Sequence, residues 1–326
     1  MKPRSIACVI DHDILGAVRR GKETNKRAAY DISLVRALRR LCSSVYLVGA
    51  VEKSSRTIDE LARLKPSVIF NLAFSADPFE ASFAGALEML GMPYTGSGPF
   101  GIALANDKIR SRRLLEAAGI PVPRFVELPR RRRPAKIDFA PPFIVKPVCL
   151  ANSSGIRANN IVTTYAQALK RADRIWQEYE VSSVCDQFIV GREFHVAMVE
   201  TKRGAFKIAA IVELFFAEAE PGRGFKSEEI RSKGKSWRVH PVSFRLAKLP
   251  QRKMTEIAEV ACAAANVLDL RGYAKVDLRM DDRQRITVIE ANANPGLLST
   301  SVIWRHPSFA ANLTKIMDAA VKRSRE

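Results

Sequence analysis

The fold of this chain is decided near its C-terminal end by two segments, residues 275–279 (KVDLR) and residues 289–296 (IEANANPG). In both, polar and apolar side chains alternate, which is the pattern of a β-strand with one face buried. We expect two adjacent strands here. Their buried face is predicted to consist of Val276, Leu278, Ile289 and Ala291.

The opposite, polar face of these strands is a candidate metal site. Asp277, Glu290 and Asn292 would meet across the two strands, with Lys275 and Arg279 on the same side. Oxygen donors of this kind suit Mg²⁺ that bridges nucleotide phosphates, with water or substrate completing the octahedron. A polar strand pair that faces solvent is the alternative. The Asn-Pro-Gly turn that follows favours the metal site, because such a turn can aim N–H groups at an anion.

Two lysines and two serines are candidate phosphate ligands. Lys108 follows Asp107, a suitable N-cap, so its ammonium would lie at a helix N-terminus, where phosphate binds well. Lys146 ends a short apolar strand, and Pro147 fixes the chain behind it. Ser153 and Ser154 lie in the small-residue loop that follows and could cover phosphates. Each of these residues alone would more often be a solvated polar group.

Residues 186–194 (DQFIVGREF) form an apolar segment with polar flanks. Such a segment could line the pocket of a nucleotide base, with backbone groups that recognise adenine and Glu193 bound to ribose hydroxyls. The alternative is a hairpin in which Gly191 is only a turn and Glu193 pairs with an arginine.

Short apolar runs alternate with helical patterns over the first hundred residues. Strands are predicted at residues 5–10, 45–48 and 68–72, and helices at residues 27–41, 58–64 and 79–90. This alternation implies a parallel sheet covered by helices. The turn-rich residues 94–99 (YTGSGP) place a domain boundary close behind them.

The rest of the chain changes to longer strands. Helices are predicted at residues 107–118, 165–176, 251–268 and about 307–321, and strands at residues 143–146, 161–163, 193–201, 206–214, 272–280 and 285–291. We therefore expect an α/β fold, α+β in its C-terminal part. Its three predicted units are residues 1–102, 103–185 and 186–326.

Composition excludes several classes of protein. The chain has 326 residues, 47% of them hydrophobic, which is typical of a globular protein and not of a disordered one. No apolar stretch reaches the roughly 18–20 residues that a membrane span needs. Asp11 interrupts the N-terminal apolar run, so no secretory signal is expected. The five cysteines are scattered without a CxxC pair, which favours a reducing cytoplasm over a disulfide framework or a zinc site.

The chain is strongly basic, with 53 Lys and Arg against 34 Asp and Glu and a net charge of +19. Its densest clusters, residues 130–133 and 223–238, are predicted to be surface loops. A nucleic acid, an anionic membrane surface or an acidic partner could also explain the surplus. Arg110, Arg112 and Arg113 are expected on one exposed helix.

Taken together, these segments resemble the ATP-grasp superfamily and, within it, the D-alanine–D-alanine ligase family. The matching segments occur in the family's order and are residues 88–97 (EMLGMPYTGS), 106–108 (NDK), 144–147 (IVKP), 191–194 (GREF), the set Asp277, Glu290 and Asn292, and residues 294–296 (NPG). The resemblance implies an ATP-grasp fold with an N-terminal Rossmann-like domain, and ATP between a central and a C-terminal domain.

The resemblance also implies roles for single residues. Lys108 and Lys146 would bind phosphates and Glu193 the ribose, while adenine would lie near Asp186 and the backbone of Gln187, Phe188 and Ile189. Asp277 and Glu290 would bind one Mg²⁺ or Mn²⁺ ion, and Glu290 with Asn292 a second. Lys275, where the family usually has arginine, and the N–H of Gly296 would stabilise the tetrahedral intermediate. Ser301 would bind the carboxylate of the second substrate.

The implied reaction has two steps. A carboxylate attacks the γ-phosphate of ATP, and an amine then displaces phosphate from the acyl phosphate to form an amide. The substrates would be amino acids or peptides, D-alanine by default, and the family implies a homodimer. Two alternatives remain: a ligase of other specificity, acting on an acidic protein or building a specialised peptide, and a basic nucleic-acid-binding protein.

Four segments depart from the family pattern. The phosphate loop is residues 150–154 (LANSS), and residues 74–80 (FSADPFE) replace a glycine-rich stretch. Glu23 is the candidate for the glutamate that binds the first amino group. Lys233 and Lys235 are candidates for the lysine of a loop over the active site at about residues 216–239.

Overall fold

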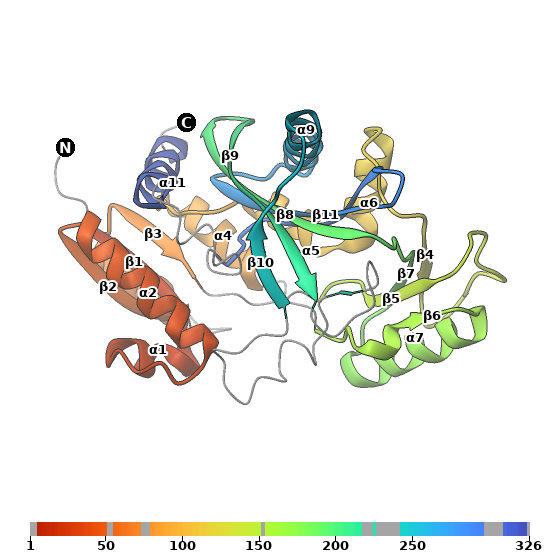
Figure 1. The fold of residues 1–326 in the computed structure, drawn as a ribbon. Coiled ribbons are helices and arrows are strands. Elements are labelled where there is room, and N and C mark those ends of the chain that lie inside the picture. The colour runs from red at the N-terminus through yellow and green to blue at the C-terminus, as the bar shows by residue number, and fades with distance from the viewer. Residues whose placement is uncertain are drawn as a thin grey trace.

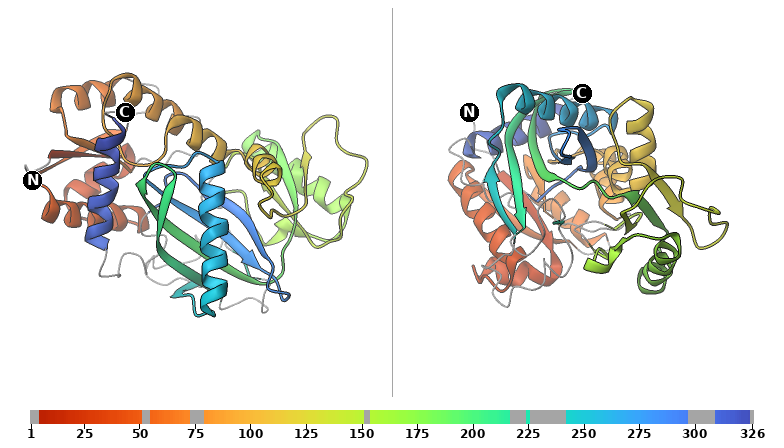
Figure 2. Two further views of the ribbon diagram at one scale, coloured as in Figure 1. Left: turned by 90° about the horizontal axis from the view of Figure 1, so that it is seen from above. Right: turned by 45° about the vertical axis from the view of Figure 1, so that its right-hand side comes forward.

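The computed structural model describes residues 5–50, 55–72, 79–150, 154–216, 224–225, 242–296 and 309–324. Within these residues the strands form sheets of three, five and four strands (Figure 1). The three-stranded and four-stranded sheets lie at opposite ends of the molecule, with the five-stranded sheet between them, as Figure 2 shows. No membrane-spanning helix is found in the described part of the chain.

The N-terminal sheet is parallel, as predicted. Its strands, in the order β2-β1-β3, are β1 (Ser5–Asp11), β2 (Ser44–Ala50) and β3 (Val68–Asn71). Its helices are α1 (His12–Arg19), α2 (Lys26–Leu41), α3 (Arg56–Leu64) and α4 (Phe79–Met89). The sequence pattern does not predict α1, which has only eight residues. Its buried residues include Ile14, Leu15 and Val18, which join the N-terminal core.

Helices α5 (Pro99–Asn106) and α6 (Lys108–Ala117) follow the turn-rich segment. That segment is a buried joint between the N-terminal and C-terminal parts. Ser97 Oγ donates to the carbonyl of Ala293 at 2.9 Å. Gly96 has a φ of +91°, and a Cβ there would lie 3.1 Å from Oδ1 of Asn294. The predicted boundary at residues 102/103 falls inside α5, which the sequence pattern does not predict.

The four-stranded sheet is antiparallel and has α7 (Tyr165–Tyr179) packed on it. Its strands, in the order β4-β7-β5-β6, are β4 (Phe125–Leu128), β5 (Phe143–Pro147), β6 (Ile161–Val162) and β7 (Ser183–Gln187), with the short helix η1 (Ala158–Asn160) before β6. The predicted boundary at residues 185/186 falls inside β7, all of whose residues pair with β5. Strands β4 and β7 are short and are not predicted from the sequence.

The five-stranded sheet is also antiparallel. Its strands, in the order β10-β9-β8-β11-β12, are β8 (Arg192–Lys202), β9 (Ala205–Phe216), β10 (Val242–Leu246), β11 (Tyr273–Met280) and β12 (Ile286–Asn292). Helix α9 (Gln251–Val267) lies across this sheet (Figure 2). Helix α11 (Phe309–Arg323) contacts β8, α2 and β3, and so joins this sheet to the N-terminal part.

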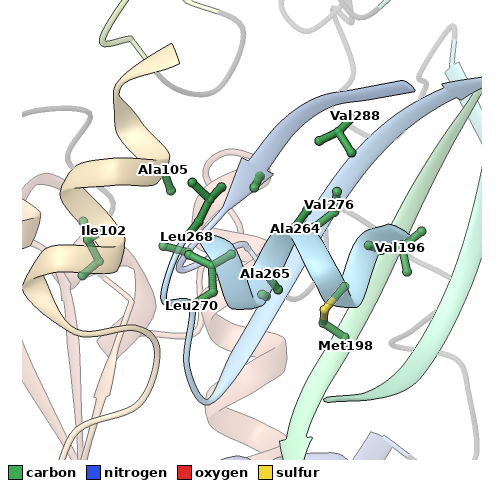
Figure 3. Packing of buried hydrophobic residues seen from close by; sticks show 14 of the residues in the cluster. Ile102, Ala105, Val196, Met198, Ala264, Ala265, Leu268, Leu270, Val276 and Val288 are labelled. Carbon is green, nitrogen blue, oxygen red and sulfur yellow. The ribbon is translucent and has the colours of Figure 1, made fainter. Parts of the chain in front are cut away.

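The apolar face of β11 points into the core under α9. Figure 3 shows Val276 close to Ala264 and Ala265 of α9, with Val196 and Met198 of β8 in the same cluster. Leu278 and Ala291 also lie in this core, as predicted. Because strand residues alternate between faces, the polar residues of β11 are turned to the opposite side.

The prediction that Ile289 faces the core was wrong. Strands β11 and β12 pair Asp277 with Glu290 but Leu278 with Val288, so Ile289 is the extra residue of a β-bulge. Val288 takes the core position with 1% exposure, and Ile289 is only partly buried. A bulge shifts the alternation of faces by one residue, which the sequence pattern alone does not reveal.

Candidate active site

The first candidate residues lie at the N-terminus of α6. Asp107 is the predicted N-cap, and its carboxylate accepts hydrogen bonds from the N–H groups of Ile109 and Arg110 at 3.0 and 2.8 Å. Lys108 is 4% exposed, and its ammonium donates to the carbonyl of Leu150 at 2.6 Å. Burial lowers the pKa of Lys108 below its usual range.

The second lysine is held by a buried carboxylate. Nζ of Lys146 lies 3.1 Å from Oδ2 of Asp186, and Nη2 of Arg112 lies 2.8 Å from the same oxygen. The prediction that Arg112 is exposed was wrong, since only 2% of it is exposed. Arg112 lies four residues after Lys108 in α6, and this spacing places both on the same side of the helix. We call Lys108, Arg112, Lys146 and Asp186 the cation cluster.

Asp186 is fully buried, with 0% exposure. The family resemblance implies that it lies near adenine. In the structure its carboxylate pairs with Lys146 and Arg112 from β7, and its place near adenine stays a prediction.

The strand register brings the predicted metal ligands together. Asp277 lies opposite Glu290, and Lys275 opposite Asn292. Nδ2 of Asn292 is 3.5 Å from Oδ2 of Asp277, and Nζ of Lys275 is 2.9 Å from that oxygen. Oε1 of Glu290 lies 4.0 Å from Nζ of Lys108. The oxygen donors of β11 and β12 therefore border on the cation cluster.

This donor set fits Mg²⁺ or Mn²⁺. Its two carboxylates and one carboxamide offer oxygen, the ligand atom that these ions prefer. The side chains of Asp277 and Glu290 keep 15% and 28% of their surface exposed, so a ligand can reach them. In the described part of the chain, no group of three or more His, Cys, Asp or Glu side chains could hold a metal by itself. An ion here would therefore need phosphate and water ligands, as Mg²⁺ commonly has.

Glu193 lies in a network of polar and charged side chains on the same face of the sheet. Its Oε1 is 3.6 Å from Nε2 of His195, and its Oε2 is 3.5 Å from Nη1 of Arg279. Nε2 of His195 is also 3.6 Å from Oδ1 of Asp277. Burial alone would raise the pKa of Glu193, but His195 and Arg279 outweigh it, so this pKa lies below its usual range. Glu193 is thus an ionised acceptor, suited to hydroxyl groups. It also pairs with Arg279, as the alternative hairpin hypothesis predicts.

Gly191 precedes this network and is required by close packing. Its φ is +151°, and a Cβ there would lie 2.1 Å from the carbonyl oxygen of Met280. Arg279 Nη2 donates to the carbonyl of Gly191 at 2.9 Å. The glycine therefore lets the segment between β7 and β8 run directly against the end of β11.

The predicted adenine segment is anchored to the four-stranded sheet. The N–H groups of Gln187 and Phe188 donate to the carbonyls of Arg124 and Pro142, each at 2.8 Å. The guanidinium of Arg279 lies 4.7 Å from the centre of the Phe188 ring. Ile189, the next residue, is half-buried. The segment is thus held in place from both sheets, although two of its N–H groups are already engaged.

Of the phosphate loop, the structure describes Leu150 and Ser154, and hydrogen bonds hold the residue that follows it. The carbonyl of Gly155 accepts from Nδ2 of Asn160 at 2.9 Å and from Nη2 of Arg171 at 3.1 Å. Ser153 lies outside the described residues, as do Ser301, Lys233 and Lys235.

Gly296 lies on the side of the site that faces the N-terminal part. A Cβ on Gly296 would be 4.0 Å from the ring of Tyr30 in α2. Nearby, Nδ2 of Asn294 donates to Oε1 of Glu80 at 3.1 Å. Burial raises the pKa of Glu80 to about 7. Asn294 therefore links the turn after β12 to α4.

A second charged group, which we call the acidic cluster, surrounds this link. Arg27 lies 3.5 Å from Oδ2 of Asp11 and 3.3 Å from Oδ2 of Asp31. Glu80 completes the cluster and interacts electrostatically with Arg27 and Asp11. Burial raises the pKa of Asp31 to about 7, although Arg27 opposes the shift.

Sequence reasoning missed two residues of the site, Arg112 and His195, although a signal exists for each. Arg112 follows Lys108 by four residues on a helix, and His195 follows Glu193 by two on a strand. In both cases the spacing places the missed residue on the same face as a predicted one.

Comparison with known proteins agrees with this fold. A family model for the D-ala D-ala ligase C-terminus matches residues 114–312, which is more than half of the chain. The chain belongs to the D-alanine–D-alanine ligase family. It is therefore an ATP-dependent ligase with the ATP-grasp fold, as the sequence predicts.

Two relatives illustrate this family membership. The chain is 30% identical over 260 residues to the D-alanine–D-alanine ligase of Bordetella petrii, covering 77% of this chain and 74% of that protein. It is also 30% identical over 273 residues to an uncharacterized protein, y4sG, of Sinorhizobium fredii, covering 81% and 77%.

Solved structures of a D-alanine–D-alanine ligase from Bacillus anthracis show the same fold. One aligns over 99% of both chains with a TM-score of 0.75 and 18% identity. A second, complexed with ATP, aligns over the same share with a TM-score of 0.72.

Proposed function

We propose that this ligase joins two amino acids, with D-alanine as the default for both, and releases ADP and phosphate. The observation that carries the proposal is the cation cluster beside the oxygen donors Asp277 and Glu290. Two buried cations there, Arg112 and Lys146, share the carboxylate of Asp186, and a third, Lys108, lies 4.0 Å from the carboxylate of Glu290. Burying charge without a counter-ion is costly, and a nucleotide triphosphate would supply the missing negative charge.

The residue roles are those that the family resemblance implies. Lys108 and Lys146 bind the phosphates, with Ser153 and Ser154 in the covering loop, and Glu193 binds the ribose. Asp277, Glu290 and Asn292 hold one or two Mg²⁺ or Mn²⁺ ions, which neutralise phosphate charge when bound. The segment of Gln187, Phe188 and Ile189 lies beside the base, near Asp186, which also pairs with Lys146 and Arg112.

The chemistry needs positioning and charge more than a protein nucleophile. The carboxylate of the first substrate attacks the γ-phosphate, and the amine of the second displaces phosphate from the acyl phosphate. Lys275 and the N–H of Gly296 stabilise the negative charge that develops in the second step. Lysine keeps the charge of the family's arginine without its bidentate fork. Ser301 keeps its proposed role toward the second carboxylate.

Release of ADP tests this proposal directly. We expect MgATP-dependent ADP release with D-alanine in a panel of D- and L-amino acids and dipeptides. Mass spectrometry should detect the dipeptide product. Turnover with a different pair of substrates would show a different specificity, while the proposed ligase chemistry would stand. No turnover with any pair at saturating Mg²⁺ would count against the function itself.

A second candidate keeps the chemistry and changes the acceptor to an acidic protein or a specialised peptide. The surplus of 19 positive charges favours it, as do the exposed Arg130, Arg131 and Arg132 at the edge of the central part. A basic surface attracts an acidic partner. Amino-acid mass additions to an acidic protein, without turnover of free amino acids, would select this candidate. The comparisons favour either ligase over a nucleic-acid-binding protein.

Four further proposals follow from family membership. We propose a homodimer, a cytoplasmic location, a contribution to peptidoglycan biosynthesis, and three units, predicted as residues 1–102, 103–185 and 186–326, whose exact limits shift to the ends of α5 and β7. Light scattering tests the first of these, and limited proteolysis tests the last.

A further inference from the structure

Arg112 contacts three parts of the site at once. Its Nη1 donates to the carbonyl of Lys108 at 2.8 Å. Its Nη2 donates to Oδ2 of Asp186 at 2.8 Å and to the carbonyl of Ile289 at 3.3 Å. These partners belong to α6, β7 and β12, so one guanidinium joins the central part of the chain to the C-terminal sheet.

Each partner of Arg112 either is a residue proposed to bind nucleotide or metal, or directly contacts or precedes one. Lys108 is itself a phosphate ligand, and Asp186 is shared with Lys146 at 3.1 Å. Ile289 directly precedes Glu290, and it is the bulged residue that sets where Glu290 points. Arg112 therefore lies behind both lysines and behind one metal ligand.

The chemistry of arginine suits this place. A guanidinium is planar, stays charged when buried, and presents donors in a fixed fork. A lysine has one nitrogen and could not reach all three acceptors in the same geometry. A buried ion pair is weak grounds for stability, so a cation this deeply buried calls for another role.

We infer that Arg112 is a positioning residue that sets the spacing between the phosphate-binding lysines and the carboxylate of Glu290. Arg112 and Lys146 both contact Oδ2 of Asp186. Because Arg112 competes for this oxygen, the ion pair between Asp186 and Lys146 is weaker, and the Lys146 ammonium stays available to phosphate. This inference rests on the proposed function and names no new ligand.

Calorimetric titration with ADP, with and without Mg²⁺, tests the inference. The variants are Arg112→Met, Arg112→Lys and, as a matched control, Arg113→Met, which removes an exposed arginine from the same helix. We expect MgADP affinity to fall about 10- to 100-fold in Arg112→Met, the range seen when partners behind metal ligands are removed. Arg112→Lys should fall less, and Arg113→Met should match the unmodified chain.

Two further measurements separate positioning from a general loss of structure. In Arg112→Met, the affinity for ADP should fall more with Mg²⁺ than without it, because the proposed metal ligand Glu290 is displaced. In turnover, the KM for ATP should rise while the KM for the amino acid stays constant. A destabilised enzyme would instead lose active fraction with both KM values unchanged.

The failure of each idea has its own signature. If Arg112→Met binds MgADP as well as Arg113→Met does, the positioning role is wrong. Should Arg112→Met fail to fold, Arg112→Lys decides the question, since wild-type affinity in that folded variant would also overturn the inference. If neither the unmodified chain nor Arg113→Met binds MgADP, the proposed function has failed instead.

Discussion

Two groups of charged residues in this chain, one buried and one partly buried, have opposite excesses of charge. The cation cluster combines Lys108, Arg112 and Lys146 with one carboxylate, Asp186. The acidic cluster combines Arg27 with three carboxylates, Asp11, Asp31 and Glu80. The first borders on the predicted metal ligands, and the second lies at the joint between the N-terminal part and the turn after β12.

The difference shows which cluster needs a ligand. A buried carboxyl can escape its charge by taking up a proton, and burial raises the pKa of both Asp31 and Glu80 to about 7. In the cation cluster Arg112 stays protonated and is paired with Asp186, whereas burial lowers the pKa of Lys108, a shift that a bound polyanion would oppose. The acidic cluster can therefore be stable without a ligand, whereas the cation cluster favours a polyanion.

The largest expected effect concerns the edge of the cation cluster. Glu290→Gln removes a carboxylate without changing the volume of the side chain, so we expect the chain to fold and kcat to drop by roughly 10²–10³-fold, the scale of losing one preorganised charge contact. Steady-state ADP release measures this. Glu259→Gln, an exposed glutamate of α9, is the matched control. If Glu290→Gln kept most of its activity, Glu290 would not be a metal ligand. The proposed difference between the two clusters, that only the cation cluster lies beside a ligand site, would then lose its main support.

A smaller effect is expected in the acidic cluster. Arg27→Met removes its cation, and we expect the free energy of unfolding to fall by about 2 kcal/mol near pH 8, where the carboxyls are ionised. Near pH 5 the loss should be smaller, because protonated carboxyls need no counter-ion. Urea unfolding at both pH values measures the difference, with Arg36→Met, exposed on the same helix, as control. Equal losses at both pH values would contradict the protonation of this cluster.

The smallest effect is a change in how steeply the free energy of unfolding varies with pH. Asp31 and Glu80 hold their protons more tightly in the folded chain than in the unfolded one, so the folded chain binds more protons between about pH 4 and 7 and its stability falls as pH rises through this range. Asp31→Asn should flatten that fall, because it removes one of the two carboxyls whose pKa is raised, and urea unfolding across the range measures it. An unchanged slope would show that Asp31 is already ionised.

Much of the fold and part of the site could be predicted from the sequence. Strands β1, β2 and β3 and helices α2 and α7 follow from apolar runs and helical spacing, which are local properties. The short elements α1, β4 and β7 were missed, because so few residues do not show a clear local pattern. Asp277, Glu290 and Asn292 could be placed on one face because strand alternation is regular, and Ile289 could not, because a bulge breaks that regularity.

The sequence by itself determined the family, the order of the elements and the residue types available for phosphate and metal. Only the tertiary structure decided that Arg112 is buried, that Asp186 serves two cations, and that one charged cluster has excess positive charge while the other has excess negative charge. Burial and pairing of charges depend on which segments meet in space. Residues 112, 186 and 289 lie on three separate elements, and no local pattern records that they touch.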